Sequence, residues 1–114
     1  ARHLKRKMEA DVVFEEMILE RIDGMYELVD KAFDNMQVLL KKRKVTEAEI
    51  LESRHIENSI NEKRNFLKRE NVENLNQNLY SYQNGVFYMD IISECERMGD
   101  YIMNVIESLE MKES

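Results

Sequence analysis

Apolar residues recur at steps of three and four along most of this chain, which is the spacing of one face of an α-helix. The first block, from about residue 4 to 42, has the stripe Leu4, Met8, Ile18, Ile22, Met25, Val29, Phe33, Met36 and Leu40. A second, from about 47 to 71, has the sparser stripe Ile56, Ile60 and Leu67. A third, from about 82 to 111, carries Phe87, Ile91, Cys95, Met98, Ile102, Val105 and Leu109. The pattern predicts three amphipathic helices.

Local signals mark where these helices begin and end. Thr46, followed three residues later by Glu49, has the pattern of a capping box and predicts the start of the second helix. The basic run 41–44 suits the negative end of the first helix dipole, so we interpret it as a helix terminator rather than a nucleic-acid patch. The stretch 71–85 is rich in Asn, Gln, Ser and Gly, which predicts a turn within it.

Helices of this kind hide their apolar stripes by packing side by side. We therefore expect residues 1–114 to form a single all-α domain, an antiparallel up-down-up three-helix bundle. The absence of proline and the presence of only three glycines also favour helices over strands. At 1.5 Å per residue the first helix would be roughly 58 Å long. It should project beyond the bundle or bend, with Gly24 the favoured position for a bend.

Composition then excludes several classes of protein. Charged residues make up 35% of the chain and the net charge is -6, which argues against nucleic acid as a partner. The single cysteine, Cys95, cannot form an internal disulfide, which favours a reducing compartment, and its place on the apolar stripe predicts a buried, unreactive thiol. No apolar run approaches the roughly 20 residues of a membrane span. The start at Ala1 leaves open that the chain is part of a longer protein.

Catalytic chemistry has little support in the sequence, which predicts that this is not an enzyme and has no small-molecule substrate. No Ser/His/Asp order, phosphate-binding glycine loop or zinc spacing is present. Glu52 and His55 have the Glu-x-x-His form of di-iron bundles, but those need the motif twice and two more Glu, so His55 is interpreted as a surface or boundary residue. Aromatic residues gather near the start of the third helix, where they either cap the bundle or form a protein contact: Tyr80, Tyr82, Phe87 and Tyr88.

Acidic residues follow a helical pattern of their own. A ridge opposite the first apolar stripe forms either a solvated face or a surface for a partner or metal: Glu16, Glu20, Asp23, Glu27, Asp30 and Asp34. Asp11 and Glu15 instead lie on the apolar stripe itself. They mark either the end of the bundle or an interior site, and the first alternative is favoured because unpaired buried charges are unfavourable.

The acids around Gly99 suggest a metal site. A glycine inside a helix costs about 1 kcal/mol relative to alanine, so either a neighbouring backbone comes close here or the flanking acids have a function. Glu96 and Asp100 lie roughly 140–180° round the helix from the stripe through Ile91, outside the core. Acids four residues apart repel each other unless a cation intervenes. With Glu57 and Asn61 of the second helix and further ligands from a neighbour, they would form a site for a divalent or iron-type ion.

These same residues carry a resemblance to a known family. The run from Glu96 to Asp100 (Glu-Arg-Met-Gly-Asp), followed by Asn104 and Glu107, resembles the signature of the PhoU family of phosphate-uptake regulators. Residues 54–67 are similar to the matching run on the middle helix of that family. One three-helix unit is present, whereas free-standing PhoU proteins have two. A lone unit of this length resembles the cytoplasmic C-terminal domain of bacterial sodium/phosphate cotransporters, and the basic segment 2–7 would suit the inner face of a membrane.

The resemblance implies a function and a set of ligands. It implies regulation of phosphate transport by contact with a transmembrane phosphate-transport domain in the same chain, at the cytoplasmic face of the inner membrane. It also implies metal ligation by Glu57, Glu96 and Asp100. Asn61 stands where the family usually has Asp, which removes a charge and predicts a weakened or vacant site. The alternative is a soluble helical oligomerisation or adaptor domain without metal, in which Glu96 and Asp100 form salt bridges with Arg97 or Arg64. Homo-oligomerisation is open in both cases.

Overall fold

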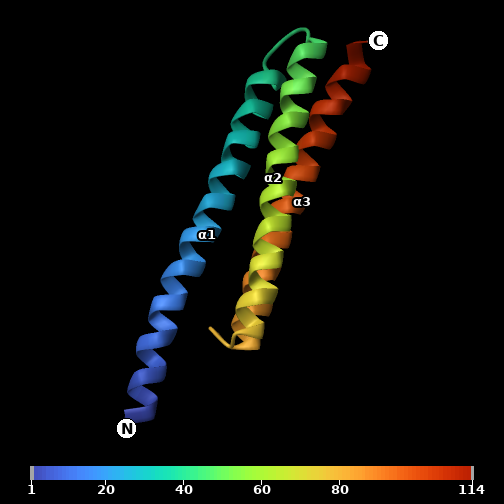
Figure 1. The fold of residues 1–114 in the computed structure, drawn as a ribbon. Coiled ribbons are helices and arrows are strands. Elements are labelled where there is room, and N and C mark those ends of the chain that lie inside the picture. Colours follow the sequence, from blue (N-terminus) through green and yellow to red (C-terminus); the bar gives the residue numbers. More distant parts are fainter. Residues whose placement is uncertain (1, 114) are drawn as a thin grey trace.

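The computed structural model describes the backbone of residues 2–113 and the side chains of residues 16–109. It contains α1 (Arg2–Leu40), α2 (Glu47–Asn76) and α3 (Tyr82–Glu113), and no strand lies within residues 2–113. The helices run up, down and up, and each contacts both of the others (Figure 1). The predicted all-α three-helix bundle is therefore confirmed. Across the part of the chain that is described, no helix combines the length and the apolar character needed to cross a membrane.

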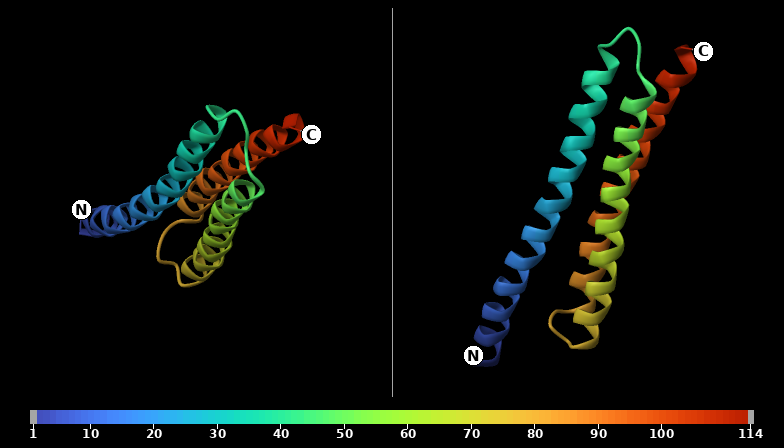
Figure 2. Two further views of the ribbon diagram at one scale, coloured as in Figure 1. Left: turned by 90° about the horizontal axis from the view of Figure 1, so that it is seen from above. Right: turned by 45° about the horizontal axis from the view of Figure 1, so that its top comes forward.

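The long first helix projects beyond the other two. Its amino-terminal end extends past the α2–α3 connection, and the molecule has a longest dimension of 66 Å (Figures 1 and 2). α1 continues through Gly24 without interruption. Of the two expected alternatives, projection is the one observed. The predictions for Asp11 and Glu15, and for Leu4 and Met8, concern side chains outside the described range.

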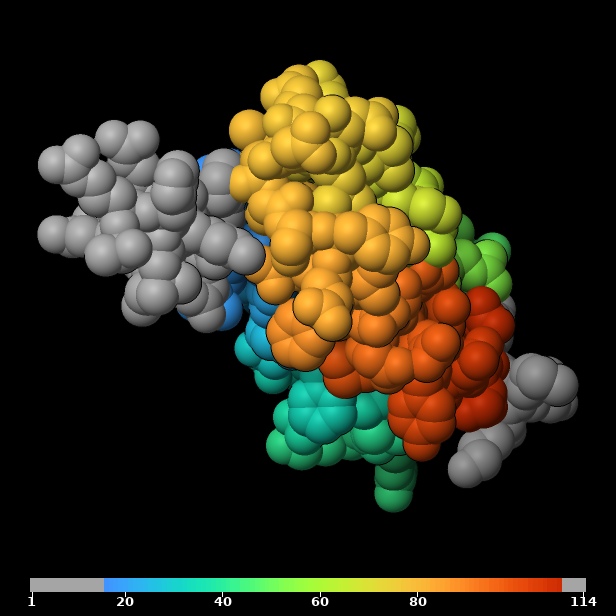
Figure 3. All heavy atoms as spheres, turned by 90° about the horizontal axis from the view of Figure 1, so that it is seen from below, coloured from blue at the N-terminus to red at the C-terminus, as the bar shows by residue number. Residues whose placement is uncertain are grey.

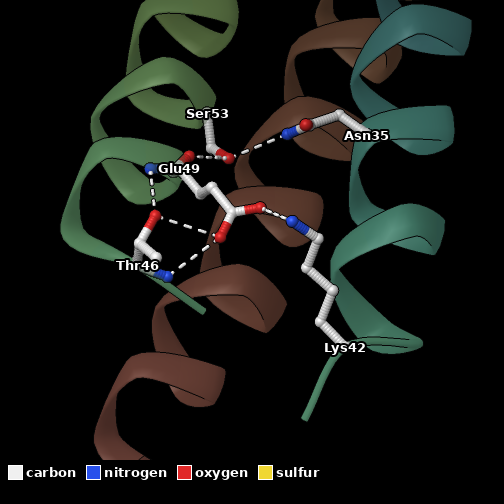
Figure 4. A network of polar contacts seen from close by, with 5 residues as sticks. All are labelled: Asn35, Lys42, Thr46, Glu49 and Ser53. Carbon is white, nitrogen blue, oxygen red and sulfur yellow. Dashed lines mark hydrogen bonds and ion pairs between the residues drawn. The ribbon is translucent and has the colours of Figure 1, made fainter. Parts of the chain in front are cut away.

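The start of α2 is fixed by the predicted capping box. The backbone N–H of Glu49 donates to Thr46 Oγ1 at 3.2 Å, and the backbone N–H of Thr46 donates to Glu49 Oε1 at 3.0 Å (Figure 4). Lys42 also donates to the Glu49 carboxylate. The hydrogen bonds from Lys42 and then from the Thr46 backbone lower the pKa of Glu49 to about 2, because they stabilise its charged form.

The α2–α3 connection lies inside the stretch in which the sequence predicts a turn. Asn78 is left-handed at φ 56°, a conformation that asparagine tolerates. The N–H groups of Asn78 and Leu79 donate to the carbonyls of Leu75 and Asn74, each at 3.0 Å, which is a Schellman motif. Ser81 then caps α3 by accepting a 3.1 Å hydrogen bond from the Asn84 backbone. α2 thus ends at Asn76, five residues beyond the predicted end.

The core contains most residues of the predicted apolar stripes. On α3, however, the buried face is rotated partly round the helix from the predicted stripe. Phe87 and Met98 are 67% and 41% exposed, so their assignment to the core is wrong. Ile91, Val105 and Leu109 only pack against the core. The fully or nearly buried α3 residues are Tyr88, Ile92, Cys95, Ile102, Met103 and Ile106. The difference arises because α3 must face both α1 and α2, which places its buried face next to the predicted stripe.

A smaller correction applies to α1. Phe33 and Leu40 are 44% and 49% exposed, and their neighbours Ala32 and Leu39 are buried in their place. The remaining described members of the predicted stripe are buried: Ile18, Ile22, Met25, Val29 and Met36. The six acids of the ridge from Glu16 to Asp34 are all exposed, as a solvated face requires.

Candidate functional site

Gly99 brings α2 and α3 close together. It lies inside α3 and is buried, and a Cβ atom added there would be 3.1 Å from Ile60 Cδ1 of α2. Its φ is not positive, so the glycine serves packing rather than backbone freedom. Another helix therefore approaches at Gly99, through the Ile60 side chain and not through the backbone contact that the sequence suggested. The contact also places the acids on either side of Gly99 along the boundary between α2 and α3.

Three contacts between charged side chains follow this boundary, and we call them the α2–α3 seam. Arg64 of α2 forms an ion pair with Glu96 of α3. Glu57, about two turns before Arg64 on α2, meets Asp100, about one turn after Glu96 on α3. Further along, Arg54 Nε lies 3.9 Å from Glu107 Oε1. Two acids of α3 thus face a cation, whereas Asp100 faces another carboxyl group.

The middle contact of the seam changes the acidity of Glu57. Burial, a hydrogen bond with Asp100, and the negative charges of Asp100 and Glu107 raise the pKa of Glu57 to about 7, against a smaller lowering by Arg54. Two carboxyl groups in contact avoid repulsion when one of them keeps its proton. At neutral pH Glu57 is therefore about half protonated.

The predicted metal ligands are only partly brought together. Glu57 and Asp100 meet, but Glu96 is engaged by Arg64. Asn61 is half-buried one turn after Glu57, and no hydrogen bond is found for it within residues 16–109. Among the described side chains, no three of His, Cys, Asp or Glu are gathered as a metal site requires. The arrangement in one chain therefore supplies two carboxylates and does not complete a ligand set.

The comparison with protein families gives one match. Residues 22–109 match the PhoU domain, which is most of the chain and includes all three contacts of the seam. The chain belongs to the PhoU domain family. Searches of curated proteins and of solved structures give no significant match. PhoU domains are regulatory and non-enzymatic, with a role connected to phosphate, which agrees with the lack of catalytic motifs.

The structure also shows where the cysteine, the histidine and the aromatic residues of the sequence analysis lie in this PhoU domain. Cys95 is fully buried, and burial raises the pKa of its thiol, as expected for an unreactive cysteine. His55 is exposed, which confirms its interpretation as a surface residue. Of the aromatic group near the connection, Tyr80 and Tyr88 are buried. Tyr82 and Phe87 are exposed, so half of the group closes the end of the bundle and half is available for contacts.

Two polar contacts between α1 and α2 of the PhoU domain have no counterpart in the sequence predictions. Ser53 accepts a 2.8 Å hydrogen bond from Asn35 Nδ2 and donates to the Glu49 carbonyl, which ties α1 to α2 (Figure 4). At the other end, Arg21 of α1 pairs with Glu70 of α2, close to the fully buried Tyr88. Burial raises the pKa of Tyr88 to about 12. For the buried position of Ser53, the sequence offered one signal, which is that polar residues interrupt the apolar stripe of α2.

Proposed function

We propose that this PhoU domain is the regulatory domain of a sodium-dependent phosphate transporter, located at the cytoplasmic face of the inner membrane. It acts by protein contact with the transmembrane part of the same chain. The observation that carries the proposal is the match of residues 22–109 to the PhoU domain. The basic segment 2–7 supports it further, since such segments favour the inner surface of a membrane.

The α2–α3 seam is the part of the surface best suited to transmit a signal. It contains a carboxyl pair that changes its proton content near neutral pH, because the pKa of Glu57 is about 7. The arginines on either side hold the neighbouring acids in place. A change in the charge of this pair would alter the face that α2 and α3 present to a partner.

Two experiments test the transporter proposal. The first determines the coding sequence before Ala1, which we expect to encode paired hydrophobic spans of roughly 20 residues each. A soluble domain in that position would contradict the proposal. The second measures uptake of radiolabelled phosphate, with and without sodium, by cells that express the complete gene. Reversing the seam charge with Asp100→Lys should change sodium-dependent uptake at equal protein level, whereas the exposed control Glu62→Lys should not.

Metal binding is a separate part of the proposal. A cation at the seam would take Glu57 and Asp100, with the Asn61 amide as a neutral third ligand and others from water or a second chain. Glu96 would contribute only after leaving Arg64. Metal analysis after native purification tests this site. A stoichiometric metal that survives dialysis and is lost in Glu57→Gln and Asp100→Asn, but retained in Glu62→Gln, supports it; absence of binding at any added concentration removes it.

The second candidate function is an adaptor or oligomerisation domain without metal. The Arg64–Glu96 ion pair favours this candidate, because it gives Glu96 a structural partner. The sequence before Ala1 separates the two candidates, and a stoichiometric bound metal would count against the adaptor.

A further inference from the structure

The surface between α1 and α3 has an apolar floor that runs along the bundle. Leu19, Tyr26 and Phe33 follow each other at seven-residue steps on α1 and are 53%, 43% and 44% exposed. Phe87 and Tyr101 lie two such steps apart on α3 and are 67% and 68% exposed. Because α1 and α3 run in the same direction, the two lines follow each other along the bundle (Figure 1). A seven-residue apolar repeat is typical of a helix face that packs against another helix.

A groove of about 430 Å³ lies between these two helices, and its lining includes Phe33, Met98 and Tyr101. In Figure 3, side chains of α1 in teal and of α3 in orange to red lie next to each other on this side. We call the groove and the two apolar lines beside it the α1–α3 groove. Its elongated shape suits a helical ligand, whose apolar anchors recur at steps of three, four and seven residues.

The apolar area of the α1–α3 groove is in the range of a binding site. Tyr26, Phe33, Phe87 and Tyr101 leave roughly 300–550 Å² uncovered, because an aromatic side chain buries about 150–250 Å² when fully covered. Exposed apolar patches of this size, when polar residues surround them, mark sites at which proteins bind a partner or a ligand. The polar residues at the edges therefore indicate which partner the groove accepts.

Acidic side chains follow both edges of the groove. On α1, six exposed acids lie roughly 20–100° round the helix from Leu19, on the side away from the core: Glu16, Glu20, Asp23, Glu27, Asp30 and Asp34. On α3, Asp90 and Glu94 are exposed along the opposite edge. Arg97 lines the groove as well, but it already forms an ion pair with Glu94. Lys31 lies on the far side of the α1 acids, so the edges of the groove are strongly negative.

We infer that the α1–α3 groove binds a basic amphipathic helix of a partner protein. Such a helix has an apolar stripe with Lys and Arg on either side of it. The stripe would cover Tyr26, Phe33 and Tyr101, and the cations would meet the acids on both edges. From Glu16 to Asp34 the acids of α1 extend over 18 steps of 1.5 Å, about 27 Å, which is the length of five turns of a bound helix. An acidic helix would instead place like charges opposite each other.

The inference goes beyond the proposed function and does not rest on it, because it states only which class of helix the groove binds. It is compatible with a membrane protein as the partner, since the cytoplasmic segments of membrane proteins are rich in Lys and Arg.

The first experiment measures binding of a fluorescent synthetic peptide to the 114-residue chain by fluorescence anisotropy. The peptide has about 18 residues, with Leu on one face of the helix, Lys on either side of that face and Ala elsewhere. We expect saturable binding of one peptide per chain, which weakens as the salt concentration rises. Two control peptides should bind at least about tenfold more weakly. One has Glu in place of Lys, and the other has the same composition with Leu spread round the helix.

The second experiment asks whether the acids at the edge of the groove attract the basic peptide. One variant neutralises three acids of α1: Asp23→Asn, Glu27→Gln and Asp30→Asn. The control variant neutralises three exposed acids of α2: Glu52→Gln, Glu62→Gln and Glu73→Gln. Both variants change the net charge by the same amount. The α1 variant should bind the peptide about tenfold more weakly, and the α2 variant should stay within about twofold of the wild type.

The third experiment tests the apolar floor of the groove. Phe33→Ala and Tyr101→Ala should each weaken binding of the basic peptide about fivefold or more, because each removes an aromatic contact. The control Phe66→Ala alters an α2 side chain of similar exposure, 55%, and should leave binding unchanged. Circular dichroism checks that every variant keeps its helix content. The charge variants need no change in the core, so they test the groove even if an alanine variant loses stability.

Three results would overturn the inference. The first is a wild-type chain that does not bind the basic peptide, including the case in which another protein surface already covers the groove. The second is an equal loss of binding in the α1 and α2 charge variants, which would mean that the peptide responds only to net charge. The third is full affinity in both Phe33→Ala and Tyr101→Ala, which would place the peptide elsewhere. If the peptide binds as expected while Asp100→Lys leaves phosphate uptake unchanged, the result counts against the proposed function alone.

Discussion

The carboxyl pair of the α2–α3 seam predicts an unusual dependence of stability on pH. Its pKa of about 7 in the folded chain compares with an ordinary value of 4.5 for Glu57. The folded state therefore binds more protons than the unfolded chain between these values. The stabilisation from this proton is fully present below about pH 4.5 and is lost as the pH rises through about 7.

The size of the effect follows from the difference between the two pKa values. At 1.36 kcal/mol per pKa unit, a change from 4.5 to about 7 corresponds to at most about 3.4 kcal/mol. Glu57 is half-buried at the edge of the bundle, where water screens the charges of Asp100, Glu107 and Arg54. An effect of about 1–2 kcal/mol is therefore expected.

The test is Glu57→Gln, which keeps the shape of the side chain and an N–H donor toward Asp100 but removes the titration. Urea unfolding followed by circular dichroism gives the free energy of unfolding at pH values from 4.5 to 8.5. The variant should equal the wild type near pH 4.5 and exceed its stability by about 1–2 kcal/mol at pH 8.5. The control Glu62→Gln changes the net charge equally at an exposed position of α2 and should follow the wild-type pH profile.

Two outcomes would refute this reasoning. One is a wild type whose stability does not fall relative to Glu57→Gln between pH 4.5 and 8.5. The other is a variant that is less stable than the wild type at every pH, which would mean that ionised Glu57 is stabilised by Arg54. The low pKa of Glu49 does not interfere, because its contribution changes only below about pH 4.5.

Three further substitutions test the packing and the helix start, each by the free energy of unfolding in urea. Gly99→Ala should stay within about 1 kcal/mol of the wild type, because the gain in helix propensity offsets a close contact that the end of the Ile60 side chain can relieve by moving. Gly99→Val should lose about 2 kcal/mol or more, because its larger side chain overfills the contact with α2. Equal stabilities of the two variants would refute the close approach of α2. Thr46→Ala should lower the free energy of unfolding by about 1 kcal/mol, because it removes the side chain that caps α2. An unchanged free energy of unfolding would mean that the capping box of Thr46 and Glu49 does not stabilise the start of α2. Met25→Ala, at a position with no exposed surface, should cost about 2–5 kcal/mol, and a loss below 1 kcal/mol would contradict its burial.

The sequence by itself determined the helices of this protein and the local signals at their ends. The three- and four-residue spacing, the capping box at Thr46 and the turn-forming residues before Ser81 act over a few residues, so they can be read without knowing the neighbours. The run around Gly99 likewise identified the family, and its acids were correctly placed outside the core. These features depend on short-range geometry that any helix imposes.

Only the tertiary structure decided which side of each helix is buried and which charges meet. α3 carries apolar residues over a wide arc, and its contact with both α1 and α2 buries Tyr88 and Ile92 while leaving Phe87 in water. The partners of the seam acids also depend on the register between α2 and α3, which the close contact at Gly99 sets. That register gives Glu96 an arginine and Asp100 a carboxyl group, because side chains more than 30 residues apart in sequence come together only when the helices pack.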